Sequence, residues 1–189
     1  IGEVLDKTAI EHWAPQIGGQ FWWGGLIFTF IFVPLMFYIG KNLSKKNRDY
    51  MLYGMGVYQL GKTFMVQMSH VLSDNYIIAT HLPLQLCAIS GIMAGVIVFY
   101  RKQMLFEFLY FFVIVGFIHS ILTPEFTGGN SYWNIFDYYV GHSMLLIVPV
   151  WLMMFYNFRL RDNAWWISFI YLHFLVVLVI QINTIIAVS

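Results

Sequence analysis

The sequence contains one cysteine and six histidines, the residue types best suited to covalent and acid–base chemistry in an otherwise apolar chain. Cys87 lies near the start of an apolar stretch, six residues after His81. A lone cysteine in such a stretch is usually an inert small hydrophobe. It becomes a nucleophile when a base or a positive charge helps it to ionise. His81 and Cys87 point about 120° apart on an ideal helix, and Pro83 between them can change that angle.

Three further residues could activate such a thiol or bind what it reacts with. His142 follows Gly141, and a glycine there lets a neighbouring helix approach closely. Asp137, five residues before His142, could orient a histidine or pair with a cation. Lys62 is the costliest of them to bury in a bilayer, and Asp137 or a lipid phosphate are its alternative partners. His142, His81 and Lys62 therefore stand as alternative activating groups for the thiol.

These residues lie in a chain whose composition assigns it to a membrane. Hydrophobic residues make up 60% of the chain and charged residues 10%, against roughly 45–50% and 25% in an ordinary soluble domain. Each of six apolar stretches is long enough to cross a bilayer as a helix: residues 21–40, 51–71, 77–100, 104–123, 132–157 and 164–187. We predict an all-α polytopic bundle of about six transmembrane helices. It forms a single domain over residues 21–189, preceded by an extramembrane N-terminal arm over residues 1–20.

The charges of the joints between these stretches predict the orientation. The first, third and fifth joints hold eight of the ten basic residues, and the second and fourth hold none. The positive-inside rule places those three joints in the cytoplasm and both termini outside. Glu107, near the cytoplasmic end of its stretch, could extend its carboxylate to the membrane surface or pair there with Arg101 or Lys102. We expect a multi-pass protein of a bacterial cytoplasmic (inner) membrane.

Polar residues gather in the outer halves of the predicted helices, although the helices alternate in direction. Hydrogen bonding between helices is a sufficient explanation for any single Gln, Ser or Thr. A set of Lys, Asp, Cys and His side chains, several of them roughly 10–16 Å below the outer surface, favours a site instead. We expect a polar cavity open to the outer leaflet. The predicted substrate-binding residues are Lys62, Gln85, His119 and Asp137.

Other classes of function lack their sequence features. There is no His-x-x-His or His-Glu-x-x-His motif, no phosphate loop and no dinucleotide fingerprint. The formal charge of +1, without a basic patch beyond the short joints, argues against a nucleic-acid partner. We therefore expect no metal, no cofactor and no nucleic acid, with membrane lipids as the partners and protein partners in a membrane complex as a further possibility.

Residues 81–87, which read His-Leu-Pro-Leu-Gln-Leu-Cys, resemble the signature of the bacterial YwaF-like proteins and their animal relative, transmembrane protein 164. The likeness continues through residues 106–112, Gly116, residues 122–124 and residues 141–142. The resemblance implies an integral-membrane acyltransferase that moves a fatty-acyl chain between lipids without coenzyme A. It also implies that Cys87 accepts the acyl chain, that His142 is its base and that His81 is a supporting polar residue.

The resemblance further implies a second histidine where Gln85 stands and a helix beyond Ser189. The alternative to an enzyme is a non-catalytic helical subunit of a larger membrane complex, or part of a transporter. The aromatic runs in residues 106–117 and 132–139 would then face a protein partner. A transporter often shows two related halves, and the sequence has no such internal repeat. The alternatives differ at Cys87, which a subunit could lose without effect and an enzyme could not.

Overall fold

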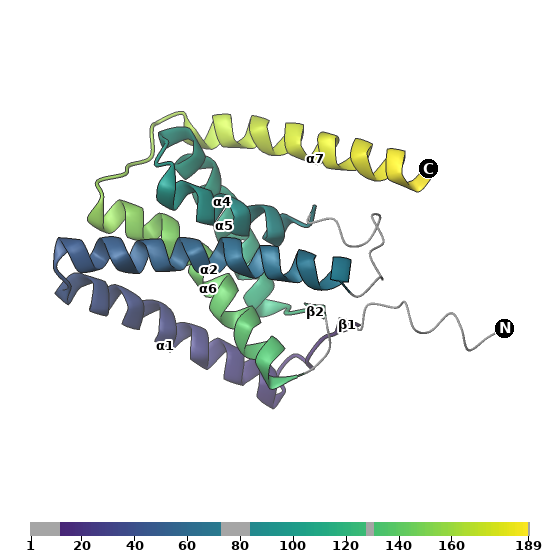
Figure 1. The fold of residues 1–189 in the computed structure, drawn as a ribbon, viewed down its shortest axis with the longest axis horizontal. Helices are drawn as coiled ribbons and strands as arrows, with labels where there is room; N and C mark the ends of the chain where they lie inside the picture. Colours follow the sequence, from purple (N-terminus) through teal and green to yellow (C-terminus); the bar gives the residue numbers. More distant parts are fainter. Residues whose placement is uncertain (1–11, 73–83, 128–130, 189) are drawn as a thin grey trace.

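Six α-helices make up nearly all of the described chain, which comprises residues 12–72, 84–127 and 131–188 of a computed structural model (Figure 1). They are α1 (Gln20–Asn42), α2 (Lys45–Leu72), α4 (Leu86–Phe99), α5 (Gln103–Leu122), α6 (Tyr132–Phe155) and α7 (Ala164–Val188). A pair of two-residue strands, β1 (His12–Trp13) and β2 (Phe126–Thr127), completes the regular structure of this part of the chain. The predicted helical bundle is confirmed.

The helices differ in how well they suit a bilayer. α1, α5, α6 and α7 are each long and apolar enough to cross a membrane. α2 is the longest, at 28 residues, but carries more charged and polar side chains. α4 is apolar but has 14 residues, which give a length of about 21 Å. The prediction of a helix over residues 77–100 is confirmed for its later part only. Residues 77–83 lie outside the described chain, and α4 begins after the extended backbone of Gln85.

The first predicted joint is also much shorter than expected. Residues 41–50 were expected to link two helices, but α1 runs to Asn42 and α2 begins at Lys45. Ser44 Oγ accepts a hydrogen bond of 3.4 Å from the backbone N–H of Asn47, and serine is favoured at such a helix start. The polar side chains that predicted a loop therefore occupy the first turns of α2.

α6 is the centre of the bundle and packs against α1, α2, α4 and α5. The core lies in its second half, where large side chains from several helices are completely buried: Leu52, Ile97, Leu109, Ile147 and Trp151. α7 lies at the edge of the bundle (Figure 1) and packs mainly against α5. Most of its apolar side chains are exposed. Such a face suits lipid contact, because a bilayer solvates apolar side chains.

Polar contacts join the three basic joints at one end of the bundle. Glu107 is 1% exposed, and its carboxylate forms a bidentate pair with Arg161, with Nη2–Oε2 at 2.6 Å and Nε–Oε1 at 2.9 Å. The prediction that Glu107 pairs with Arg101 or Lys102 is wrong. Arg101 instead lies 3.7 Å from Asp49 at the start of α2. The α6–α7 joint folds back over the start of α5. The sequence did not predict this contact, because the two segments are more than 50 residues apart.

Glycines allow α2 and α4 to pack closely. A Cβ on Gly95 would overlap Leu60 Cγ and lie 3.1 Å from the backbone oxygen of Gly56. We expect Gly95→Ala to lower the free energy of unfolding by about 1–3 kcal/mol, because the crowded helices must move apart. Thermal melting in detergent would measure this. Gly54→Ala is the matched control, since a Cβ there meets nothing within 4 Å. An equal effect of the two substitutions would contradict the prediction.

Candidate functional site

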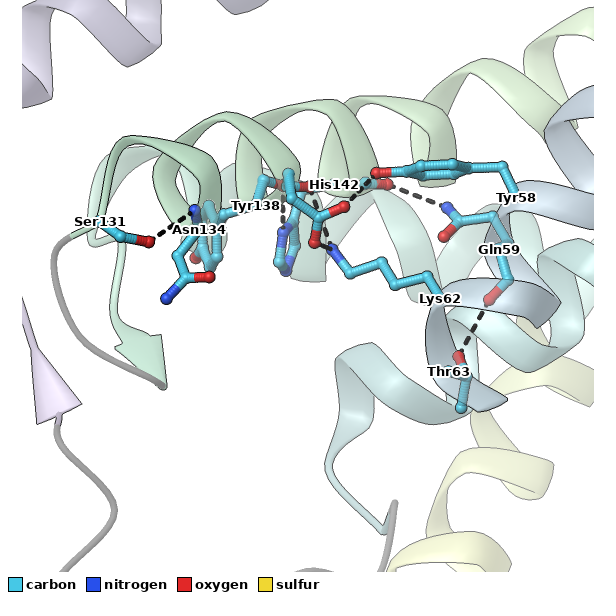
Figure 2. A network of polar contacts seen from close by, with 10 residues as sticks. Tyr58, Gln59, Lys62, Thr63, Ser131, Asn134, Tyr138 and His142 are labelled. Atoms are coloured by element: carbon cyan, nitrogen blue, oxygen red, sulfur yellow. Dashed lines mark hydrogen bonds and ion pairs between the residues drawn. The ribbon is translucent and has the colours of Figure 1, made fainter. Parts of the chain in front are cut away.

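An ion pair between α2 and α6 forms the centre of the polar network in Figure 2. Lys62 Nζ lies 2.6 Å from Asp137 Oδ2 and donates a second bond of 3.0 Å to the backbone oxygen of the same residue. Tyr58, one turn before Lys62 on α2, donates to Asp137 Oδ1 at 2.5 Å. The two charged side chains are 27% and 26% exposed. Asp137, one of the two partners expected for Lys62, pairs with it in the structure.

Gly141 allows α2 to approach α6 at this pair. Gln59 Nε2 donates to the Gly141 backbone oxygen at 2.9 Å. A Cβ on Gly141 would lie 2.7 Å from Lys62 Nζ, which is too close for undisturbed packing. The glycine before His142 therefore makes room for the Lys62 ammonium group, a role consistent with the close approach expected from the sequence.

This contact yields a testable prediction. Gly141→Ala should displace the Lys62 ammonium group and weaken its pair with Asp137, lowering the free energy of unfolding by about 1–2 kcal/mol. In a Lys62→Met background the same substitution should cost about 1 kcal/mol less, because no ammonium group is left to displace. The measurement is a double-mutant cycle by denaturation in detergent. Additive effects of the two substitutions would show that Gly141 does not act through Lys62.

His142 is half-buried on α6, and its protonation pattern follows from one contact. Its Nδ1 lies 2.8 Å from the backbone oxygen of Tyr138. A carbonyl oxygen only accepts hydrogen bonds, so Nδ1 carries a proton, and in the neutral form of the ring the lone pair is on Nε2. Exposed His173 on α7 makes the same 2.8 Å contact with Phe169. The contact is therefore a local feature of helices and sets the tautomer without itself marking a site.

Cys87 is half-buried in the first turn of α4, and its contact leads to α5. Its Sγ lies 3.7 Å from Ser120 Oγ. Tyr138 on α6 donates its hydroxyl to the Ser120 backbone oxygen at 3.0 Å and lies against the His142 ring, with ring centroids 4.0 Å apart. The contacts thus lead from Cys87 through Ser120 and Tyr138 to His142. In the described residues, no hydrogen bond joins the thiol directly to the imidazole.

The strand pair packs against Tyr138, the residue that links Ser120 to His142. β1 and β2 pair antiparallel, with Trp13 opposite Phe126. The ring of Phe126 is 1% exposed and packs on Tyr138 at a centroid distance of 4.6 Å. The described part of the N-terminal arm is therefore attached to the loop between α5 and α6, close to the residue that links Ser120 to His142.

Other predicted site residues lie away from these contacts. His119 is exposed, and its Nδ1 lies 3.4 Å from Thr123 Oγ1 on its own helix. Gln85 is the exposed N-cap residue of α4, and its side chain makes no capping hydrogen bond. The predicted site residue His81 lies outside the described residues. Among the described residues, no three His, Cys, Asp or Glu side chains gather closely enough to hold a metal ion.

Sequence reasoning did not select Tyr58, Ser120 or Tyr138 as site residues. Tyr58 and Tyr138 could have been found, because each lies four residues before a predicted site residue, Lys62 or His142, and so shares its helix face. Ser120 depends on how α4, α5 and α6 pack, which no spacing within one helix reveals.

An apolar groove of about 290 Å³ lies between α4, α5 and α7. Its walls include Ile89, Met93, Phe108, Phe174 and Leu178. This groove differs from the polar cavity expected from the sequence, since its lining is apolar and aromatic. The polar side chains of the network are bonded to one another at the interfaces of α2, α4, α5 and α6.

The fold and these contacts define a multi-pass helical membrane protein with a polar network between its helices. The chain belongs to the TMEM164 family, whose family model matches residues 13–188. This match covers nearly the whole chain and confirms the family suggested by residues 81–87. Neither a search of curated proteins nor a search of solved structures finds a match to the chain.

Proposed function

We propose that this TMEM164-family protein is a membrane acyltransferase that moves a fatty-acyl chain between lipids through a thioester on Cys87. The observation that carries the proposal is the connected set of contacts from the sole cysteine through Ser120 and Tyr138 to His142. A thiol and a neutral imidazole are the two groups that covalent acyl transfer requires. Family membership supports the same chemistry through the resemblance at residues 81–87.

The first half of the proposed reaction forms the acyl-enzyme. Cys87 Sγ attacks the carbonyl carbon of a lipid ester while its proton passes to His142 Nε2. The ester C–O bond breaks, and the departing lysolipid oxygen takes that proton from His142. The thiol and imidazole must approach each other when substrate binds, and catalytic hydrogen bonds are often longer in the absence of substrate.

The second half returns the enzyme to its starting state. The hydroxyl of an acceptor lysolipid, or an amine of a lipid-linked acceptor, attacks the thioester carbonyl carbon and gives its proton to His142. The C–S bond breaks, and the leaving Cys87 sulfur takes the proton back. No coenzyme A or other cofactor is needed, because each ester or thioester activates the next transfer.

The position of Cys87 in α4 suits this chemistry. It is the second residue of the helix, and the N-cap Gln85 leaves the first backbone N–H groups without a side-chain cap. Helix N-termini favour negative charge through these N–H groups and the helix dipole. Both the thiolate and the oxyanion of the tetrahedral intermediate carry such a charge, so the first turn of α4 can stabilise them.

Within the described residues, Asp137 occupies two of the three N–H donors of the Lys62 ammonium group, which leaves one for a substrate. We propose that the third binds a phosphate or ester oxygen of the lipid, with Gln85 and His119 as exposed contacts for its headgroup. The site would then lie in the outer leaflet of a bacterial cytoplasmic membrane, with both termini outside, as the basic joints at the opposite end indicate.

A transfer assay in proteoliposomes tests the proposed function. The liposomes contain a phospholipid with an isotope-labelled acyl chain and an unlabelled lysolipid, without coenzyme A. We expect His142→Gln to slow transfer by about 10²–10⁴-fold, because an amide cannot act as a general base. His173→Gln is the matched control, since that residue makes the same local contact on exposed α7. Equal rates for the two variants, or no transfer by the wild type, would contradict the proposal.

A further inference from the structure

The hydrogen bonds of Ser120 determine how its hydroxyl faces the Cys87 thiol. Its side chain is nearly buried, with 5% of the residue exposed. Its hydroxyl donates to the Gly116 backbone oxygen at 2.7 Å. A hydroxyl has one proton, so Ser120 Oγ faces Cys87 as an acceptor and the thiol is the donor across the 3.7 Å contact. The resting thiol is therefore oriented toward α5.

The same hydroxyl has a second use once the thiol is ionised. A thiolate only accepts hydrogen bonds, so the Ser120 hydroxyl can rotate from Gly116 toward Cys87 Sγ and donate to it. The rotation costs little, because the released oxygen is a helix carbonyl that also accepts a backbone N–H. A hydrogen bond to a charged group is stronger than one between neutral groups. When the sulfur carries an acyl chain, the hydroxyl returns to Gly116.

A back-bond from a hydroxyl to the carbonyl four residues earlier is not in itself a sign of function. Thr63 makes the same bond to Gln59 at 3.0 Å, and Thr184 makes it to Ile180 at 2.8 Å. Ser120 differs from both in two respects. Its hydroxyl contacts the sole cysteine, and its backbone oxygen is held by the Tyr138 hydroxyl at 3.0 Å.

We propose that Ser120 is a positioning residue for Cys87, which orients the resting thiol and stabilises its thiolate, with Tyr138 holding the turn of α5 in place. This inference rests on the proposed acyl-Cys87 function. It adds a specific division of roles, in which His142 moves the proton and Ser120 stabilises the charge left on sulfur. No bond to Ser120 is made or broken.

Two readouts on the purified protein in lipid nanodiscs test the inference without an activity assay. The infrared S–H band reports Cys87 alone, because the chain has one cysteine. Ser120→Ala should move this band to higher frequency and slow the alkylation of Cys87 by N-ethylmaleimide about tenfold, since a hydrogen bond to the thiolate is lost. Ser120→Thr should restore both, and Tyr138→Phe should change both in the same direction by less. Thr184→Ala is the matched control for loss of a back-bond and should change neither.

The outcomes separate this inference from the proposed function. An unchanged S–H band in Ser120→Ala, an unchanged alkylation rate, or a wild-type thiol that N-ethylmaleimide does not modify would overturn the role of Ser120. If the wild type transfers acyl chains but the Ser120→Ala readouts stay at wild-type values, only the positioning role fails. If the readouts change as expected but no transfer is found, the contact with Ser120 stands and the acyltransferase proposal fails.

Discussion

Replacing Cys87 by serine is expected to reduce acyl transfer by at least about 10³-fold. Serine has nearly the same shape as cysteine and keeps a hydroxyl beside Ser120, so the fold should be preserved. A serine hydroxyl is far less ionised than a thiol at neutral pH, and no strong base contacts this position in the described residues. The measurement is the initial rate of labelled acyl transfer between lipids in proteoliposomes.

Two controls make the Cys87→Ser result interpretable. Thermal melting of the variant in detergent should match that of the wild type, because only one atom of the side chain differs. Ser90→Ala changes a buried polar side chain of the same helix, outside the proposed machinery, and should keep most of the activity. If Cys87→Ser transfers acyl chains at the wild-type rate, the chain is better explained as a non-catalytic helical subunit.

Replacing Arg161 by methionine is expected to destabilise the fold, because it leaves the buried carboxylate of Glu107 without its cation. Glu107 is 1% exposed and accepts three hydrogen bonds from the side chain of Arg161, at 2.6, 2.9 and 3.1 Å. The backbone N–H of Arg161 and the side chain of Gln103 also donate to this carboxylate, but neither supplies a positive charge. Denaturation of the purified protein in detergent would measure the loss.

A second substitution, Glu107→Gln, tests whether the loss of stability comes from the buried charge. In the double variant with Glu107→Gln no charge is left buried, so its stability should exceed that of Arg161→Met alone. Arg159→Met is the matched control, since in the described part of the chain the Arg159 side chain donates to backbone oxygens alone, at 2.7 and 2.9 Å. If Arg161→Met and Arg159→Met cost the same, the pair with Glu107 contributes little to the fold.

The fold was largely predictable because a bilayer imposes simple rules on sequence. Runs of about 20 apolar residues must be helical in a membrane, and the six predicted stretches correspond to the six described helices. Helix ends were less predictable. Lys45 starts α2 because a capping serine outweighs a locally polar sequence, whereas α4 starts at Leu86, well inside a predicted stretch. The two-residue strands were missed, since they pair residues more than a hundred positions apart.

The part of the site that could be predicted is the ion pair, because a charge buried in a membrane helix is costly without a partner. A lysine inside a membrane helix requires a counter-charge, and Asp137 was one of the two partners expected for Lys62. Depth alone could not decide which side chains meet, because residues next to each other in a helix point about 100° apart. His119 is therefore exposed while its neighbour Ser120 faces the bundle and Cys87.

The measurement that tests the central claim most directly is intact mass spectrometry of the protein purified in native lipid, with and without hydroxylamine. An acyl thioester on Cys87 should add the mass of a fatty-acyl chain, and hydroxylamine should remove it. Cys87→Ser should lack the hydroxylamine-sensitive adduct. An unmodified wild-type mass after incubation with phospholipid donors, with Cys87 shown to be a free thiol, would contradict the proposed acyl-enzyme.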